Sequence, residues 1–422
     1  MNHEILKRII AEQHVVISHA TIIQREYRFE ENANYILTGM RRAGKSTLMY
    51  DRVQDLIQKG VKWNQIIYIN FEDERLAEFR MEDFNDIVET AAELTTRTPY
   101  YFLDEIQNIE GWERFARRMA DMKAHMYITG SNAIMLSRDM EARLGGRYLS
   151  QNIMPYNFRE YVTARNISYD MALYTSSDIG KLRQSANDFM HEGGLPESLL
   201  YLDKRPYIEG IYQKVLLGDI AGRNGIRNEM GLRILMKKIA ETVCSEMSYT
   251  KLYNTLKSIG LRMSKDTVIS YIQYAKNAYL IFSVQNYFAR FVEKESIQRF
   301  YFLDNGFLNL FVDDNNTALL ENLVAITLLR MYAHPIYYLK SSKTGIYIDF
   351  FVPSTQTAIQ VAWSIQNLDT RKREVDNLVK LVQHFHEAQS YYIITHEEEE
   401  TIQVKGITIQ VIPLYRFLLK KR

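Results

Sequence analysis

The chain has 422 residues, a formal net charge of +1 at pH 7 and a single cysteine. Its length exceeds what one ordinary hydrophobic core can hold, so we expect roughly two to four domains. The hydrophobic fraction of 46% and the charged fraction of 24% are typical of globular proteins and exclude a mainly disordered, collagenous or disulfide-stapled chain. Because the net charge is close to zero, any binding of nucleic acid has to come from a local basic patch.

The cysteine content and the hydropathy of the chain indicate the cellular compartment of the protein. Cys244 is the single cysteine, so no disulfide forms within the chain, as expected in a reducing compartment. No apolar run approaches the roughly 20 residues of a membrane helix. The first residues include Glu4, Lys7 and Arg8 and lack the apolar stretch of a secretory signal. We therefore expect a cytoplasmic protein with no membrane partner.

The N-terminal segment is expected to form a helix over residues 1–13 and a first β segment at 15–17. After a short apolar run at 34–38, which predicts a buried strand, the residues from 39 to 47 read Gly-Met-Arg-Arg-Ala-Gly-Lys-Ser-Thr. This stretch fits the phosphate-binding pattern G-x-x-x-x-G-K-[ST] without a mismatch. An amphipathic pattern at 46–59 predicts the helix that follows.

In such a strand-loop-helix, the backbone N–H groups of the loop and the positive end of the helix cradle a polyphosphate. Lys45 then reaches the terminal phosphates and Ser46 holds a magnesium ion. A glycine-rich turn with an exposed lysine is the alternative that other elements must exclude. The predicted nucleotide-binding residues are Gly39, Arg41, Arg42, Ala43, Gly44, Lys45, Ser46 and Thr47.

Two acids follow a later apolar run. The run at 65–71 and the run at 100–103 both predict strands, and the second one ends in Asp104 and Glu105. A carboxylate at the carboxyl end of a neighbouring strand can ligate magnesium through water, and the adjacent one can activate the attacking water. We assign Asp104 to the metal and Glu105 to the water, against the alternative of a strand that ends in solvated acids.

Two further side chains are candidates for the same site. Asn132 ends an expected strand at 125–132 and is predicted to position the water, with a turn asparagine as the alternative. Arg147 lies in a glycine-containing loop before a further strand at 148–153. It is predicted to reach a γ-phosphate, in its own chain or in a neighbour's, and to stabilise the transition state. A solvated loop arginine is the other interpretation of this position.

These segments together resemble the AAA-type P-loop ATPases of bacteria and archaea. The resemblance is carried by Gly39–Leu48, Tyr101–Gln107, Thr129–Asn132 and Leu144–Arg147. More narrowly, the chain resembles the uncharacterised AAA family with a C-terminal domain of unknown function, which the segments 154–161, 192–197 and 218–220 also match. The resemblance implies an α/β fold with a parallel sheet, and it implies these roles: Lys45 and Ser46 as Walker A, Asp104 and Glu105 as Walker B, Asn132 as sensor 1 and Arg147 as an arginine finger. The absence of an Asn-Lys-x-Asp stretch favours ATP over GTP.

We predict four domains along the chain. They are a P-loop ATPase core at 1–155, a helical lid at 156–230, a winged-helix-like domain at 231–298 and a restriction-endonuclease-like α/β domain at 299–422. The third domain resembles a winged helix because three expected helices precede two β-rich segments. In a DNA complex its third helix would read the major groove with Lys265, Thr267, Ser270 and Gln273, and Lys276 would meet phosphate. Winged helices also bind proteins, so a DNA client and a protein client are equal alternatives.

The last domain resembles a nuclease with an altered site. In the restriction-endonuclease-like fold, a helix glutamate, a strand aspartate and an E-x-K on the next strand bind magnesium and orient water. Glu321 and Asp349 match this pattern, but Gln360 and Ala362 occupy the places of the acid and the lysine. We therefore expect a nuclease-like module that has lost catalysis.

The leading hypothesis is a magnesium-dependent ATPase of the AAA type, a hydrolase that couples its nucleotide state to a DNA- or protein-binding module. If Arg147 acts on a neighbouring chain, a homo-oligomer is required. The alternatives are a nucleotide-gated DNA-binding protein with little turnover and an active nuclease.

Overall fold

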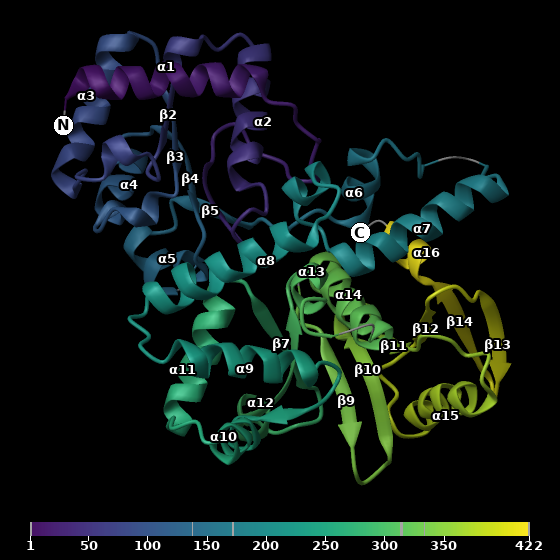
Figure 1. The fold of residues 1–422 in the computed structure, drawn as a ribbon. Coiled ribbons are helices and arrows are strands. Elements are labelled where there is room, and N and C mark those ends of the chain that lie inside the picture. The colour runs from purple at the N-terminus through teal and green to yellow at the C-terminus, as the bar shows by residue number, and fades with distance from the viewer. Residues whose placement is uncertain (1, 137, 171–172, 313–314, 333, 421–422) are drawn as a thin grey trace. The chain divides into compact units, whose positions relative to one another are not determined.

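The computed structural model describes residues 2–136, 138–170, 173–312, 315–332 and 334–420 (Figure 1). The chain forms two compact units. The first comprises Met1–Met154 with Asn277–Tyr279, and the second comprises Pro155–Lys276 with Leu280–Arg422. None of the helices in the described ranges combines the length and the apolar character that a membrane crossing requires.

The first unit is built on a parallel sheet of five strands in the order β2-β3-β4-β1-β5. The strands are β1 (Asn34–Thr38), β2 (Ile66–Asn70), β3 (Tyr100–Asp104), β4 (His125–Gly130) and β5 (Tyr148–Asn152). Every neighbouring pair is parallel. This confirms the predicted α/β class. Because parallel strands end at the same edge of a sheet, the loops after β1, β3 and β4 meet at one edge.

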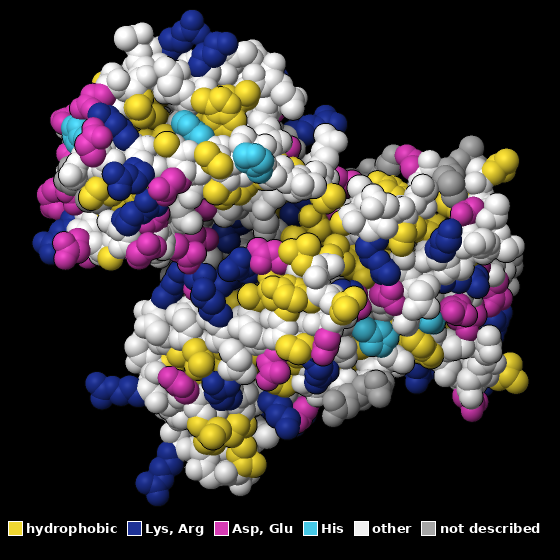
Figure 2. All heavy atoms as spheres, turned by 45° about the horizontal axis from the view of Figure 1, so that its top comes forward, with side chains coloured by type: hydrophobic (Ala, Val, Ile, Leu, Met, Phe, Trp, Pro, Cys, Tyr) yellow, Lys and Arg dark blue, Asp and Glu magenta, His cyan; other side chains and the backbone are white. Residues whose placement is uncertain are grey.

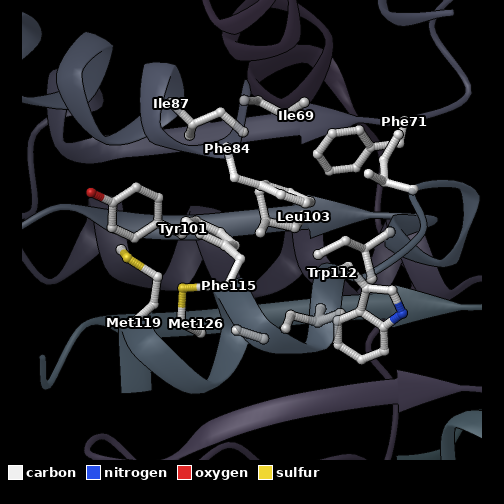
Figure 3. Packing of buried hydrophobic residues seen from close by; sticks show 14 of the residues in the cluster. Ile69, Phe71, Phe84, Ile87, Tyr101, Leu103, Trp112, Phe115, Met119 and Met126 are labelled. Carbon is white, nitrogen blue, oxygen red and sulfur yellow. The ribbon is translucent and has the colours of Figure 1, made fainter. Parts of the chain in front are cut away.

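Helices cover both faces of this sheet. They are α1 (His3–His19), α2 (Lys45–Gln58), α3 (Phe84–Leu94), α4 (Trp112–Asp121) and α5 (Arg138–Leu144). Neighbouring strand residues pack into different cores: Ile69 belongs to the cluster that contains Phe84 and Phe115, whereas Tyr68 belongs to the other cluster. Figure 3 shows the first cluster, in which the rings of Phe84 and Phe115 stack at 4.4 Å. Burial on both faces explains why the strands are continuous apolar runs.

The β segment expected at 15–17 is wrong, because α1 continues to His19. Ile17 is fully buried against the sheet, whereas Val15 and Val16 are 58% and 50% exposed. The buried side chains of α1 recur at helical spacing, at Leu6, Ile9, Ile10 and Ile17. Packing of this helical face outweighs the weak strand preference of three successive β-branched residues.

The second unit begins with helices. They are α6 (Phe158–Ala164), α7 (Ser176–Glu192), α8 (Arg205–Lys214), which continues as a π-helix (Val215–Gly222), and α9 (Glu229–Glu241). Asn157 begins α6 with a reciprocal pair of hydrogen bonds to Glu160, and Thr175 begins α7 in the same way with Asp178. The segment predicted as a lid is therefore helical. The helices are separated from one another where capping residues begin a new helix.

A mixed sheet of nine strands organises the rest of the second unit, in the order β13-β14-β12-β11-β10-β9-β7-β8-β6. The strands are β6 (Met247–Ser248), β7 (Ile281–Asn286), β8 (Ile297–Phe302), β9 (Tyr337–Ser341), β10 (Ile346–Val352), β11 (Thr357–Val361), β12 (Ser390–Thr395), β13 (Glu400–Val404) and β14 (Ile407–Pro413). The remaining helices are α10 (Tyr249–Ser258), α11 (Lys265–Asn277), α12 (Phe291–Ser296), α13 (Asn305–Leu308), α14 (Asn316–Met331), α15 (Leu368–His384) and α16 (Leu414–Leu419).

The boundary predicted between residues 298 and 299 falls inside β8. β7 pairs with β8 on one side and with β9 on the other, through Gln285↔Tyr337 and Asn286↔Tyr338. The pairing with β9 satisfies the backbone groups along one side of β7, which would be an unpaired sheet edge if β6, β7 and β8 formed a separate small sheet. The two segments predicted as separate C-terminal domains therefore share one continuous sheet.

Lys276 does not lie where a phosphate contact needs it. Its Nζ donates to Ser283 Oγ at 2.8 Å and to Gln298 Oε1 at 2.9 Å. Burial lowers the pKa of this ammonium group to about 8. The interpretation of Lys276 as a phosphate contact is therefore wrong. Its position in the last turn of α11 packs it against β7 and β8, which no helical pattern reveals.

Candidate functional site

The loop predicted to bind phosphate connects β1 to α2. Gly44 precedes the helix with a φ of 91°, a left-handed conformation that favours glycine. Gly39 has a φ of 143°, and a Cβ there would lie 2.0 Å from the carbonyl oxygen of Ile153. Ile153 N in turn donates to Thr38 O at 2.6 Å, so the backbone after β5 is pressed against the start of the loop. Only glycine fits at position 39.

The loop side chains differ in their surroundings. Ala43 is fully buried, whereas Arg42 and Thr47 are exposed. Arg41 Nη1 donates to Glu72 Oε1 at 2.9 Å, which ties the loop to the segment after β2. Arg42 adopts a φ of 62°, uncommon for a residue with a side chain. Such backbone conformations cluster at binding sites.

Lys45 lies at the amino end of α2 with only 4% of its surface exposed. Its Nζ donates to the carbonyl oxygens of Gly39 and Met40, both at 3.2 Å, and lies 3.5 Å from Glu105 Oε1. The first turn of α2 contains no acidic residue. The positive helix end and the ammonium group therefore act together, an arrangement that suits an anionic phosphate.

Asp104 ends β3 and is held by hydroxyl donors. Tyr68 Oη donates to Asp104 Oδ2 at 2.8 Å, and Thr129 Oγ1 donates to Oδ1. Glu105 N donates to the same Thr129 oxygen at 2.9 Å, so one hydroxyl of β4 connects both acids. Burial and the charge of Glu105 raise the pKa of Asp104, and hydrogen bonds from Thr129, Ser46 and Tyr68 offset part of this rise.

The pKa of Glu105 is shifted in the opposite direction. Burial raises its pKa, but the charge of Lys45, a hydrogen bond from Gln107 and the charge of Arg41 outweigh burial, so that the pKa lies below its ordinary value. Its backbone has a φ of 52°, which turns the side chain away from the strand direction. The two neighbouring carboxyl groups thus lie in different environments, as different chemical roles require.

The oxygen donors at this edge fit a magnesium ion. Ser46 is hydrogen-bonded to Asp104, so a hydroxyl and a carboxylate oxygen are adjacent. Magnesium prefers such hard oxygen ligands and is commonly held by one or two protein groups together with substrate phosphates. Ser46 and Asp104 are therefore the residues that would hold it.

The structure brings Asn132 to this edge and leaves Arg147 at the other. Asn132 follows β4, which lies between β3 and β1. Arg147 precedes β5, whose parallel register with β1 aligns Asn34 with Tyr148 and Thr38 with Asn152. A strand of this length places Arg147 roughly 17 Å from the loop of its own chain.

The arginine instead lies among residues at the amino ends of the strands. Arg147 Nε donates to Asp121 Oδ1 at 2.6 Å. It helps to line a cavity of about 540 Å³ together with Lys123, His125 and Glu30. The geometry does not direct this side chain at its own phosphate loop.

Sequence reasoning missed Tyr68, Thr129 and Gln107 as parts of the site. Tyr68 stands inside an apolar run, where its hydroxyl was the only local signal. Its role depends on the pairing of β2 with β3, which aligns Tyr68 with Phe102 and Asn70 with Asp104. The partner of a buried hydroxyl across a parallel sheet cannot be read from either strand alone.

Two parts of the chain match known families. Residues 31–162 match the family described as "AAA domain". Residues 183–318 match the family described as "Domain of unknown function (DUF8612)". An uncharacterized protein of Methanocaldococcus jannaschii is 28% identical over 434 residues, which cover 98% of this chain and 95% of that protein. An uncharacterized protein of Haemophilus influenzae is 27% identical over 408 residues, which cover 93% and 97%.

Solved structures show weaker likeness. The Walker-type ATPase paby2304 of Pyrococcus abyssi has a TM-score of 0.43 and 14% identity, covering 70% of this chain and 99% of that one. The Orc1 protein of Aeropyrum pernix in complex with DNA has a TM-score of 0.29 and 14% identity, covering 76% and 93%.

The parallel sheet and the loop between β1 and α2 form an α/β fold of the P-loop type, and residues 31–162 within it are similar to the AAA domain family. This confirms the predicted class. The match over residues 183–318 assigns no function to that part, and both full-length relatives are uncharacterized. The nuclease-like interpretation of the last part of the chain stays a prediction.

We expect Tyr68→Phe to weaken magnesium binding without removing the nucleotide. The substitution deletes the hydroxyl that donates to Asp104 and keeps the ring in the core. Loss of a partner that orients a metal-binding carboxylate commonly costs about 10–100-fold in affinity. A magnesium titration of fluorescent ATP-analogue binding measures this change. Tyr100→Phe, at the opposite end of β3, is the matched control, and equal titration curves for both variants would contradict the role of Tyr68.

Proposed function

We propose that this chain binds ATP together with Mg²⁺ and hydrolyses it. The observation that carries the proposal is the pairing of Lys45 with Glu105 at 3.5 Å, beside an Asp104 that Tyr68 and Thr129 hold in place. The burial of Lys45 speaks against the alternative of a glycine-rich turn with an exposed lysine. The burial of Asp104 and Glu105 speaks against the alternative of a strand that ends in solvated acids.

Each residue of the proposed site has its own role in hydrolysis. The loop N–H groups and the amino end of α2 bind the phosphates, and Lys45 turns its donors from the loop carbonyls to the terminal phosphates. Ser46 and Asp104 hold magnesium, which neutralises charge on the phosphate oxygens when it is bound. Glu105 accepts a hydrogen bond from the attacking water, and Gln107 fixes the other oxygen of its carboxylate. Asn132 orients the same water from its place between β3 and β1.

We expect Lys45→Ala and Glu105→Gln to separate binding from turnover. Lys45→Ala removes the phosphate contact and should abolish both nucleotide binding and magnesium-dependent phosphate release. Glu105→Gln keeps the shape and should retain binding while it slows release about 10²–10⁴-fold, the usual contribution of a general base. Lys59→Ala, on an exposed residue just beyond the same helix, is the control. Phosphate release by Lys45→Ala at the rate of the unaltered protein would refute the proposed site.

A homo-oligomer follows if Arg147 serves the site of a neighbouring chain. The distance between Arg147 and the loop of its own chain supports action on a neighbour, and the cavity beside it offers space at the chain surface. An arginine that reaches a γ-phosphate contributes about 10³–10⁵-fold to turnover.

We expect Arg147→Ala to reduce phosphate release by roughly that factor without weakening nucleotide binding. Mixing Arg147→Ala with Lys45→Ala should restore part of the activity, because one chain then supplies the intact loop and the other the arginine. Arg143→Ala, on an exposed arginine of α5, is the matched control. Failure of the mixture to recover any activity would argue against action on a neighbour.

The nucleotide site is proposed to control a winged-helix module. α9, β6, α10, α11, β7 and β8 come in the order of that motif, with the short helix α12 between β7 and β8. β8 pairs with both β6 and β7. Lys265 and Gln273 are exposed on α11. Figure 2 shows basic and acidic side chains both spread over the face in view, so a DNA contact would be local and a protein client is the alternative.

We expect Lys265→Ala to lower the salt dependence of DNA binding. If Lys265 contacts a phosphate, its removal reduces the slope of log affinity against log salt by about 1. Fluorescence anisotropy with duplex DNA, with and without nucleotide, measures the slope. Lys380→Ala on an exposed residue of α15 is the control and should leave it unchanged. Absence of binding at low salt would exclude the DNA client and leave the protein client.

A further inference from the structure

The second unit buries a separate cluster of charges in its sheet. Arg299 comes from β8, Glu321 from α14 and Asp349 from β10. Arg299 is fully buried, and the two acids are 5% and 7% exposed. Ionisable groups remain charged inside a protein only when opposite charges and hydrogen bonds compensate for the lost hydration.

The guanidinium group lies between the two carboxyl groups. Arg299 Nη1 is 3.5 Å from Glu321 Oε1 and 3.5 Å from Asp349 Oδ1. Its Cζ lies 4.5 Å from the ring centre of Tyr338 and 4.9 Å from that of Tyr347. The two rings enclose the cation, and arginine keeps its charge at every pH of interest. This side chain therefore cannot leave the cluster by becoming neutral.

Other bonds hold the acids in position. Tyr301 Oη donates to Glu321 Oε1 at 2.8 Å, and Val361 N donates to Asp349 Oδ2 at 2.9 Å. Burial raises the pKa of Glu321, as does the charge of Asp349, while Arg299 lowers it. Without the arginine, the two carboxylates would face each other in a site of low polarity.

The position of the missing nuclease acid is also filled. Gln360 Oε1 accepts from Asp349 N at 2.9 Å, and Gln360 Nε2 donates to Glu374 Oε2 at 2.9 Å. The amide is thus fully engaged in structural bonds. Within the described residues, the three-residue grouping with metal-ligand spacing is His3, Asp86 and Glu89 of the first unit, which does not include Glu321 or Asp349.

We propose that the guanidinium of Arg299 is the permanent counter-ion of Glu321 and Asp349, and that it occupies the place in which this carboxylate pair would otherwise bind a divalent cation. Both carboxylates lie within reach of one cation, but the internal guanidinium already occupies that place and offsets one of their two negative charges. The C-terminal sheet is therefore stable without metal, and no magnesium-dependent cleavage of DNA takes place at this cluster.

The test compares the unaltered protein with Arg299→Met, Arg299→Lys and the double variant Arg299→Met/Asp349→Asn. Binding of Mn²⁺ is counted from the loss of the free-ion signal in electron paramagnetic resonance, with no nucleotide present. We expect Arg299→Met to bind one more Mn²⁺ per chain than the unaltered protein and the double variant to lose it. Arg299→Lys keeps a cation in the cluster and should bind no additional ion.

Thermal unfolding supplies a second measurement on the same proteins. In EDTA, Arg299→Met should melt below the unaltered protein, because two buried carboxylates are left without their partner. Saturating Mn²⁺ should raise its melting temperature by about 5 °C or more, since a ligand at 100 times its dissociation constant stabilises measurably. Mn²⁺ should not raise the melting temperature of the unaltered protein by binding at this cluster.

Two results would overturn the proposal. One is Mn²⁺ binding by the unaltered protein that Asp349→Asn removes. The other is a folded Arg299→Met that binds no additional ion. If Arg299→Met does not fold even with Mn²⁺, the triple variant Arg299→Met/Glu321→Gln/Asp349→Asn tests the counter-ion role instead. It removes all three charges, so recovery of a folded protein supports the counter-ion role and failure to fold refutes it.

Discussion

The parallel pairing of β3, β4 and β1 is the constraint on which the nucleotide site depends. It brings the acids after β3, the threonine of β4 and the loop after β1 to one edge of the sheet. Thr129 then connects Asp104 and Glu105 through a single hydroxyl group. The same pairing sends whatever precedes each strand to the opposite edge, which is where Arg147 lies. One feature of the sheet therefore assembles the residues proposed for hydrolysis and separates the proposed arginine finger from them.

The surroundings of buried charged side chains differ between the two units. At the phosphate loop, Lys45 and Glu105 are both buried but sit beside a positive helix end that has no acidic partner in its first turn. This leaves capacity for an additional anion. In the C-terminal sheet, Arg299 meets two carboxylates and is enclosed by two tyrosine rings. In that cluster the chain itself supplies the cation. The contrast supports a working nucleotide site in one unit and a structural ion cluster in the other.

Much of the first unit could be predicted because its signals are local. Apolar runs located four strands, and the loop motif located the phosphate site, since strand burial and glycine geometry leave a pattern in neighbouring residues. The segment 15–17 shows the limit: three β-branched residues suggested a strand, but contacts of Ile17 with the sheet made it part of α1. In the second unit the predicted boundary inside β8 failed for a similar reason, since the partner of β7 is β9, some 50 residues further along the chain.

The sequence by itself determined the α/β fold class, and it located the predicted phosphate-binding loop and the two acids that follow β3. It also singled out Glu321 and Asp349 as a pair and noted the loss of the lysine beside them. Only the tertiary structure decided that Tyr68 and Thr129 hold Asp104, that Lys276 is bonded to Ser283 and Gln298, that Arg147 lies away from its own loop and that Arg299 stands between the two C-terminal acids. The physical reason is that each of these facts depends on which distant strands become neighbours and in which register. Long-range pairing leaves no periodic signal in either partner alone.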